Sequence, residues 1–178
     1  MYSKFLKLIK TNKHYDYNCY ATSQKADISE NKTFNRFFEA VKSWNWKLID
    51  KFVNNGANIN ACLVITGPQA GSTALHFACI DDDDDKALKL LEDYEVNVNS
   101  VGDDGAQPLY LACLLGHERI VNVLLDSDAN PDVEFSKKIH EKYAEFGERW
   151  SDDFGGKMTL LTFVVINNDE YLTHRILK

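Results

Sequence analysis

Two stretches of the chain decide its fold: Gly71-Ser-Thr-Ala-Leu-His-Phe-Ala-Cys79 and Gly105-Ala-Gln-Pro-Leu-Tyr-Leu-Ala-Cys113. They align without a gap at an offset of 34 residues, so that Gly71 matches Gly105 and Cys79 matches Cys113. Apolar residues at helical spacing follow each copy, and each copy then ends in an asparagine, Asn99 or Asn130. Self-similarity at a period of roughly 20 to 50 residues is the signature of a repeat architecture.

Two more divergent copies flank this pair. The equivalent apolar positions are Phe37, Leu75, Leu109 and Leu161, which are 38, 34 and 52 residues apart. A unit of roughly 33 residues accounts for all three separations, with insertions of about 5, 1 and 19 residues. Four such units can bury a continuous core, which one unit alone could not do.

Short motifs at equivalent places in these copies carry a resemblance to a known family. They are Ser72-Thr-Ala-Leu-His-Phe-Ala78, Gln107-Pro-Leu-Tyr-Leu-Ala112, Gly116-His117, and the repeat ends Gly56-Ala-Asn-Ile-Asn60 and Val96-Asn-Val-Asn99. The chain resembles an ankyrin-repeat protein over about residues 33–178. The resemblance implies an all-α solenoid of about four helix-pair repeats with hairpin fingers.

The sequence departs from the family pattern at a few positions. Phe38, Tyr110 and Thr162 stand where the family usually has His, and Asp82-Asp83 stands where it usually has Gly-His. We expect weaker hydrogen bonding between repeats at these places and no loss of the fold. The two family-like histidines, His76 and His117, are expected to be structural.

The repeat defines a domain organisation. We expect an N-terminal helical extension at 1–32 and an ankyrin-repeat domain at 33–178, with an insertion at 132–157 between repeats 3 and 4. The four repeats are expected at about 33–62, 71–100, 104–132 and 157–178. In the segment 2–14, Lys4, Lys7, Lys10 and Lys13 are interleaved with apolar residues, a pattern typical of an amphipathic helix. It either docks on the first repeat as a cap or lies on a membrane surface.

The insertion carries an aromatic stripe. Ile139, Tyr143, Phe146 and Trp150 fall at i, i+4, i+7 and i+11, which is one face of a helix. A long insertion in a solenoid often lies on the binding face. This stripe either packs back on the neighbouring repeats or contacts a partner, because Tyr and Trp are preferred at binding hot spots.

The family resemblance also implies which repeat positions contact a partner. The inner-surface positions are Lys42, Ser43, Ile80, Asp81, Leu114, Leu115, Ile166 and Asn167. The finger positions are Gln69, Ser72, Asp103, Asp104 and Ala106. Leu114 and Leu115 are conspicuous, because two adjacent leucines would either form an exposed apolar patch or be covered by the insertion.

No motif in the sequence indicates catalysis or a cofactor. The acidic run Asp81–Asp85 lacks the alternating ligands and the glycine of a calcium loop. We interpret it as a solvated acidic turn at a helix N-terminus, with contact to a basic partner as the alternative. Cys79 and Cys113 are expected to be small core residues. We expect no cofactor and no bound metal.

The net charge of −7 over 178 residues argues against non-specific nucleic-acid binding, which needs phosphate neutralisation by Lys and Arg. No apolar run approaches the roughly 20 residues of a membrane span, and the first residues lack the apolar core of a signal peptide. We therefore expect a cytoplasmic protein that does not span a membrane, and membrane binding is left only as the alternative for segment 2–14. A further interpretation is that the protein is a bacterial or viral effector that is delivered into a host cell.

These observations predict a non-enzymatic, monomeric module that binds a protein partner, one with a basic patch given the acidic balance. Binding would use the concave surface, the fingers and the insertion 132–157. Two alternatives remain open: an enzyme with its catalytic group in the insertion or the N-terminal segment, and a self-associating scaffold. The resemblance also implies that Asn60 and Asn99 could be hydroxylated.

Overall fold

The computed structural model describes residues 28–64, 69–136, 157–166 and 168–177. The described residues form eight helices and two short strands. In chain order these are α2 (Ile28–Lys42), α3 (Trp46–Asn54), α4 (Ala74–Ile80), α5 (Asp84–Asp93), α6 (Pro108–Leu114), α7 (Glu118–Asp126), β1 (Glu134–Ser136), β2 (Lys157–Thr159), α9 (Leu160–Ile166) and α10 (Glu170–Ile176).

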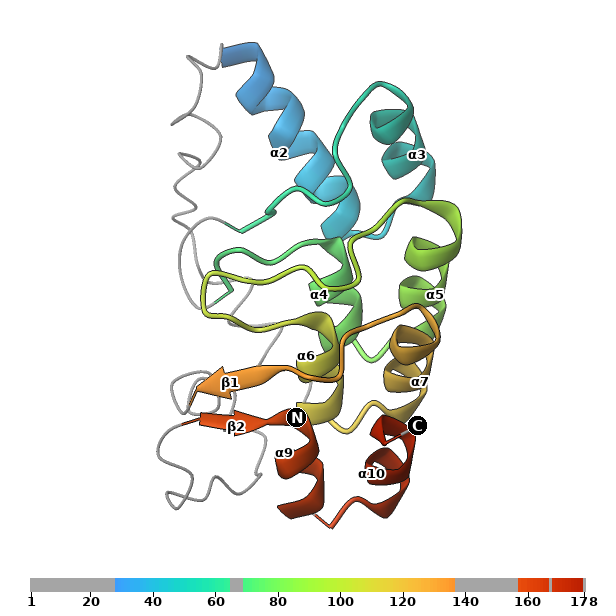
Figure 1. The fold of residues 1–178 in the computed structure, drawn as a ribbon. Helices are drawn as coiled ribbons and strands as arrows, with labels where there is room; N and C mark the ends of the chain where they lie inside the picture. The colour runs from blue at the N-terminus through green and yellow to red at the C-terminus, as the bar shows by residue number, and fades with distance from the viewer. Residues whose placement is uncertain (1–27, 65–68, 137–156, 167, 178) are drawn as a thin grey trace.

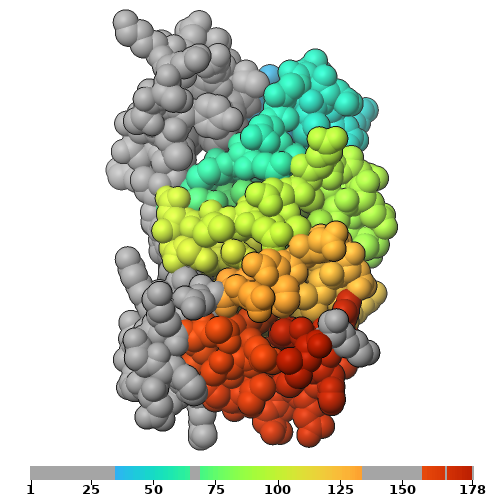
Figure 2. Space-filling view, viewed as in Figure 1, coloured from blue at the N-terminus to red at the C-terminus, as the bar shows by residue number. Residues whose placement is uncertain are grey.

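The helices form four pairs that stack in chain order (Figure 1). The inner helices α2, α4, α6 and α9 stand in one column, and the outer helices α3, α5, α7 and α10 stand in a second column. Helix α6 packs on α4 and α9, and α7 packs on α5 and α10. The space-filling view shows the described repeats as successive bands along the molecule (Figure 2). The prediction of an all-α solenoid is confirmed, with one short antiparallel ladder between β1 and β2 added.

The same turn joins the two helices in every pair. The left-handed residues are Trp44, Asp82, Gly116 and Asn168, which repeat at the predicted offsets of 38, 34 and 52 residues. The residue after each begins the outer helix as its N-cap. Asn45, Asp83 and Asp169 accept a hydrogen bond from a backbone N–H three residues on. The departure at Asp82-Asp83 therefore keeps the turn, because aspartate tolerates the left-handed region and caps helices well.

Asparagines at the repeat ends join successive repeats. The Asn60 amide donates to the Glu95 carbonyl over 2.8 Å and accepts from the Asn97 N–H over 2.6 Å. One repeat further on, Asn99 donates to the Asp128 carbonyl and accepts from the Asn130 N–H. Asn60 and Asn99, the two candidate hydroxylation positions, therefore each use both the NH2 group and the oxygen of the side-chain amide to bridge two repeats.

One hydrophobic core runs through the stack. Alanines at the contact between paired helices, Ala40, Ala78 and Ala112, are buried and allow close approach. Cys79 and Cys113 are buried core residues, as predicted, and burial raises the pKa of the Cys79 thiol. At the last interface the Tyr110 and Phe163 rings meet edge to face, with centroids 6.4 Å apart. Aromatic packing therefore takes the place of the histidine that the family has at position 110.

Candidate protein-binding surface

The hairpin fingers and the β1–β2 ladder project from one side of the solenoid, next to the inner helices (Figure 1). We call this surface the finger edge. Its described residues are 61–64, 69–72, 97–107, 130–136 and 157–159. The predicted hairpin pairing of the first finger is confirmed near its base. The Leu63 N–H donates to the Ser72 carbonyl and the Gly71 N–H donates to the Val64 carbonyl, both over 2.8 Å.

Successive fingers are held against each other by backbone contacts. The Asp103 N–H donates to the Ala70 carbonyl over 2.9 Å. A β-carbon on Gly71 would lie 2.2 Å from the Asp103 nitrogen, so only glycine permits this approach. Within the second finger, the Asp104 carboxylate accepts from the Ala106 N–H over 2.9 Å and closes the turn. The finger edge is therefore a preorganised surface.

The insertion leaves the solenoid and returns to it at the finger edge. Strands β1 and β2 pair antiparallel, with Glu134 opposite Thr159 and Ser136 opposite Lys157. The base of this hairpin is anchored by the buried side chains of Val133 and Met158. The predicted helix with Ile139, Tyr143, Phe146 and Trp150 lies outside the described residues.

His76 ties the second repeat to the next finger. Its ring nitrogen Nδ1 accepts from the Thr73 N–H over 3.2 Å, so Nε2 carries the proton that goes to the Ala106 carbonyl, 3.1 Å away. Burial lowers the pKa of His76, and the bond to Ala106 and the charge of Asp104 offset only part of that effect. The structural role expected for this residue is confirmed, with a neutral ring that uses both nitrogens.

Acid should therefore weaken the fold through His76. Below its ordinary pKa of 6.5 the unfolded chain binds a proton that the folded chain does not, because the folded pKa is lower. The free energy of unfolding should fall as the pH drops from about 6.5, by up to about 1.4 kcal/mol per pH unit, until the folded pKa is reached. Urea unfolding at a series of pH values measures this slope. His76→Gln should flatten it and exposed His174→Gln should not; equal slopes in both variants would contradict this role.

Several positions expected on the partner-binding surface are buried instead. Ile80 is 5% exposed and Leu114 is 2% exposed, and both belong to the continuous core. The finger residues Ser72 and Ala106 are also buried. The expected placement of these four residues at the surface is wrong, because their side chains are buried. Leu115 and Ile166 are half-buried against the core.

The other predicted contact positions keep some exposure. Asp103, Lys42 and Ser43 are exposed, while Gln69 and Asp104 are half-buried. Asn167 lies outside the described residues. The sequence reading missed Val101, whose side chain is 57% exposed close to Asp103 on the second finger. An isolated valine in a loop gave no pattern that could have marked it.

The acidic run is partly neutralised by neighbouring basic residues. Its placement at the start of α5 is confirmed, with Asp83 as N-cap and Asp84 and Asp85 in the first turn. The expectation of a freely solvated turn needs correction. Ion pairs join Lys86 to Asp81 and Asp83 and Arg119 to Asp84, at 3.6, 2.9 and 2.7 Å. His117 Nδ1 lies 2.8 Å from the Asp82 carboxylate, and burial lowers the pKa of His117, so that at pH 7 a neutral ring donates a hydrogen bond there.

The electrostatics of this run are local. Burial alone would raise the pKa of Asp83, but hydrogen bonds from the Lys86 side chain and backbone outweigh it and hold the pKa below its ordinary range. His117, at the N-cap of α7, reaches from the third repeat to Asp82 in the second. The run therefore fastens two repeats and offers a partner less negative charge than its composition implies.

An aromatic cluster around the start of α3 and the end of α5 also escaped the sequence reading. Trp46 stacks on Tyr94 with ring centroids 6.3 Å apart, Lys89 lies 5.2 Å from the Trp46 ring, and Lys86 lies 5.1 Å from the Trp44 ring. The signal for it was Lys86 itself, which occupies the apolar position held by Leu48, Ile120 and Leu172 in the other repeats.

The part of the chain that the structure describes contains neither a candidate metal site nor a membrane-spanning helix. No group of three or more His, Cys, Asp or Glu side chains could hold a metal ion within 28–64, 69–136, 157–166 and 168–177. No helix formed by these residues is long and apolar enough to cross a membrane.

Stacked helix pairs, interlocked fingers and asparagine bridges define an ankyrin-repeat solenoid. A family model for three copies of the ankyrin repeat matches residues 37–135. The chain belongs to the ankyrin-repeat family. Such repeats indicate a protein-interaction module, and that is the class of function this chain has.

Two relatives place the chain within the family. An ankyrin repeat protein of Acanthamoeba polyphaga mimivirus is 38% identical over 82 residues, which are 46% of this chain and 7% of that protein. Notch-regulated ankyrin repeat-containing protein A of Danio rerio is 33% identical over 102 residues, which are 57% of this chain and 89% of that protein. The chain thus spans nearly all of the second protein and a small part of the first.

Proposed function

We propose that this chain binds a protein partner, without catalysis, through its finger edge and the insertion that rises from it. The observation that carries the proposal is the β1–β2 ladder, which sets both ends of the insertion at the finger edge. The exposed Val101 and Asp103 belong to the second finger of the same edge. A partner seated there would meet rigid fingers and an aromatic-rich segment together.

Charge and preorganisation favour a partner with a basic patch. Asp103 and Asp104 lie next to each other in the finger, and Asp103 is exposed. Carboxylates at the rim of an interface mainly raise the association rate with a basic partner. Because the fingers are already hydrogen-bonded to one another, binding would cost little ordering of the backbone.

The wider setting is part of the same proposal. We infer a monomeric adaptor that works in the cytoplasm. The proposal includes a viral or bacterial effector that acts on a host protein, and the similarity to a viral ankyrin repeat protein is compatible with a viral origin. The acidic balance argues against nucleic acid as the partner.

Two sets of substitutions test the proposed surface. Tyr143→Ala with Trp150→Ala should weaken partner binding by about thirtyfold or more, the effect of losing a hot spot of about 2 kcal/mol. Asp103→Lys should slow association and leave the fold intact. The measurement is capture from cytosol at graded concentrations, with the captured protein identified by mass spectrometry.

Glu92→Lys is the matched control, because Glu92 is an exposed acid on outer helix α5, away from the finger edge. It makes the same charge change as Asp103→Lys and should leave capture unchanged. Thermal unfolding of all variants shows whether the solenoid persists. Equal capture by the wild type and the Tyr143/Trp150 variant, or equal losses for Asp103→Lys and Glu92→Lys, would count against this surface.

A further inference from the structure

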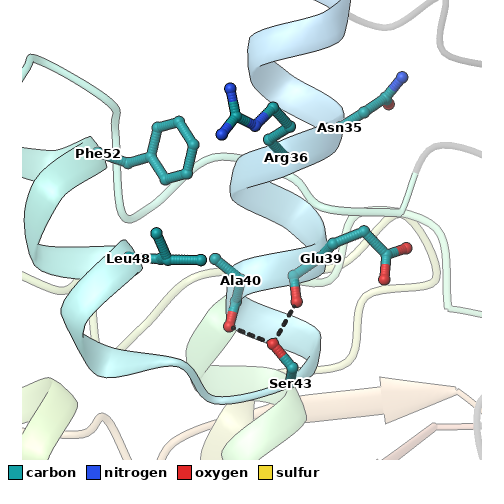
Figure 3. Close-up of a pocket in the computed structure, with 7 residues that line it drawn as sticks. All are labelled: Asn35, Arg36, Glu39, Ala40, Ser43, Leu48 and Phe52. Atoms are coloured by element: carbon teal, nitrogen blue, oxygen red, sulfur yellow. Dashed lines mark hydrogen bonds between the residues drawn. The ribbon is translucent and has the colours of Figure 1, made fainter.

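A groove of about 380 Å³ lies between α2 and α3 at the α2 end of the solenoid (Figure 3). Its lining residues are Asn35, Arg36, Glu39, Ala40, Ser43, Leu48 and Phe52. Leu48 and Phe52 point from α3 toward α2, and the Arg36 side chain reaches toward Phe52. The floor is thus apolar and the rim is polar.

The groove corresponds to an inter-repeat face. In the second repeat, the positions equivalent to Arg36, Ala40 and Phe52 are Ala74, Ala78 and Leu90, and all three are buried. In the first repeat Leu48 is 38% exposed, and Arg36 is exposed as well. No repeat precedes α2 among the described residues, so this face has no described neighbour.

The rim is not suited to another ankyrin repeat. Arg36 and Glu39 replace the Ala74 and Phe77 of the second repeat, and a stacked repeat would have to bury both charges. A charged rim around an apolar floor instead suits a narrow amphipathic segment, whose polar side stays in water.

We propose that residues 2–14 of the same chain dock in this groove as a cap on the first repeat. These residues lie outside the described ones; their sequence and the length of the chain that joins them to α2 support the docking. Phe5, Leu6, Leu8 and Ile9 supply an apolar stripe, and lysines at every third position supply the polar side.

The chain is long enough to make this contact. The connector 15–27 holds 13 residues and can span at most about 45 Å. It joins α2 at Ile28, and the groove begins at Asn35, about 10 Å further along the helix. A short tether keeps the segment at a millimolar effective concentration, so even a weak contact would be occupied.

The polar rim can meet the lysines of the segment. Glu39 is exposed at the rim and can pair with an ammonium group.

Trypsin cleavage of the full chain tests the proposal. Docking should slow cleavage after Lys7 and Lys10 by about tenfold relative to cleavage after Lys25 in the connector, because a bound site is cut only when it opens. Leu48→Arg should remove this protection. Leu88→Arg is the matched control, since Leu88 is 39% exposed on the outer helix α5 and does not line the groove.

A second variant, Leu8→Asp, removes the apolar stripe without touching the repeats and should also abolish protection. Thermal unfolding confirms that each variant keeps the solenoid. Equal cleavage rates in the wild type, Leu48→Arg and Leu88→Arg would overturn the proposal. Protection lost on dilution would assign the groove to a second copy, and protection seen only with phosphatidylserine vesicles would assign the segment to a membrane; either result overturns the cap.

Discussion

Gly71→Ala should lower the free energy of unfolding by about 3 kcal/mol or more. The added β-carbon would lie 2.2 Å from the Asp103 nitrogen and 2.8 Å from the Gly102 carbonyl carbon, which are backbone atoms of the next finger. The residue also has φ of +83°, which alanine adopts at a cost of about 1 to 2 kcal/mol. The backbone strain at position 71 and the steric overlap with Asp103 would both weaken the contact between the first and second fingers.

Gly56→Ala separates these two contributions. Gly56 has φ of +92°, and a β-carbon there meets nothing within 4 Å. Gly56→Ala should therefore lower the free energy of unfolding only by the conformational cost of the positive φ, about 1 to 2 kcal/mol. Denaturant unfolding of both variants gives the comparison. Equal losses would mean that the fingers can move apart at no cost, contrary to the preorganised edge described above.

Leu90→Ala should lower the free energy of unfolding by about 3 to 4 kcal/mol. Its side chain is fully buried on α5, within the core shared by neighbouring repeats. Truncation removes apolar contacts and leaves a cavity that a close-packed stack cannot fill. Because each repeat depends on its neighbours, the loss in the second repeat should also weaken the repeats on either side.

Leu88→Ala is the control on the same helix, because its side chain is 39% exposed. It should lose less than about 1 kcal/mol, in proportion to the smaller burial. Urea unfolding followed by circular dichroism measures both variants. If Leu88→Ala lost as much free energy of unfolding as Leu90→Ala, the assignment of a buried face and an exposed face to α5 would be contradicted.

The sequence alone predicts the repeat period, the helix pairs and the turns between them. These follow from local chemistry: apolar spacing sets the helices, and the acidic run Asp81–Asp85 marks the start of an outer helix, where Asp83 is the N-cap. The burial of Cys79 in the core could also be predicted from the sequence, because Cys113 occupies the equivalent position in the next repeat.

The binding surface was harder to predict. Family positions placed Ile80 and Leu114 at the surface, but both side chains are long and apolar enough to complete the core. Contact of the acidic run with His117 and Arg119 depends on the stacking of two repeats, which a linear pattern does not contain. The groove at α2 also depends on the stacking of the repeats, because it lies on a stacking face that has no described neighbour.

Site-specific photo-cross-linking tests most directly the claim that the finger edge binds the partner. A benzophenone side chain would replace Asp103 on the second finger or, as the control, Glu92 on outer helix α5; both positions are exposed. Each full-length protein would be irradiated in cytosol and its adducts identified by mass spectrometry. We predict one dominant protein adduct from position 103 and none of that protein from position 92. The same adduct from position 92 alone, or in equal yield from both positions, would contradict the account.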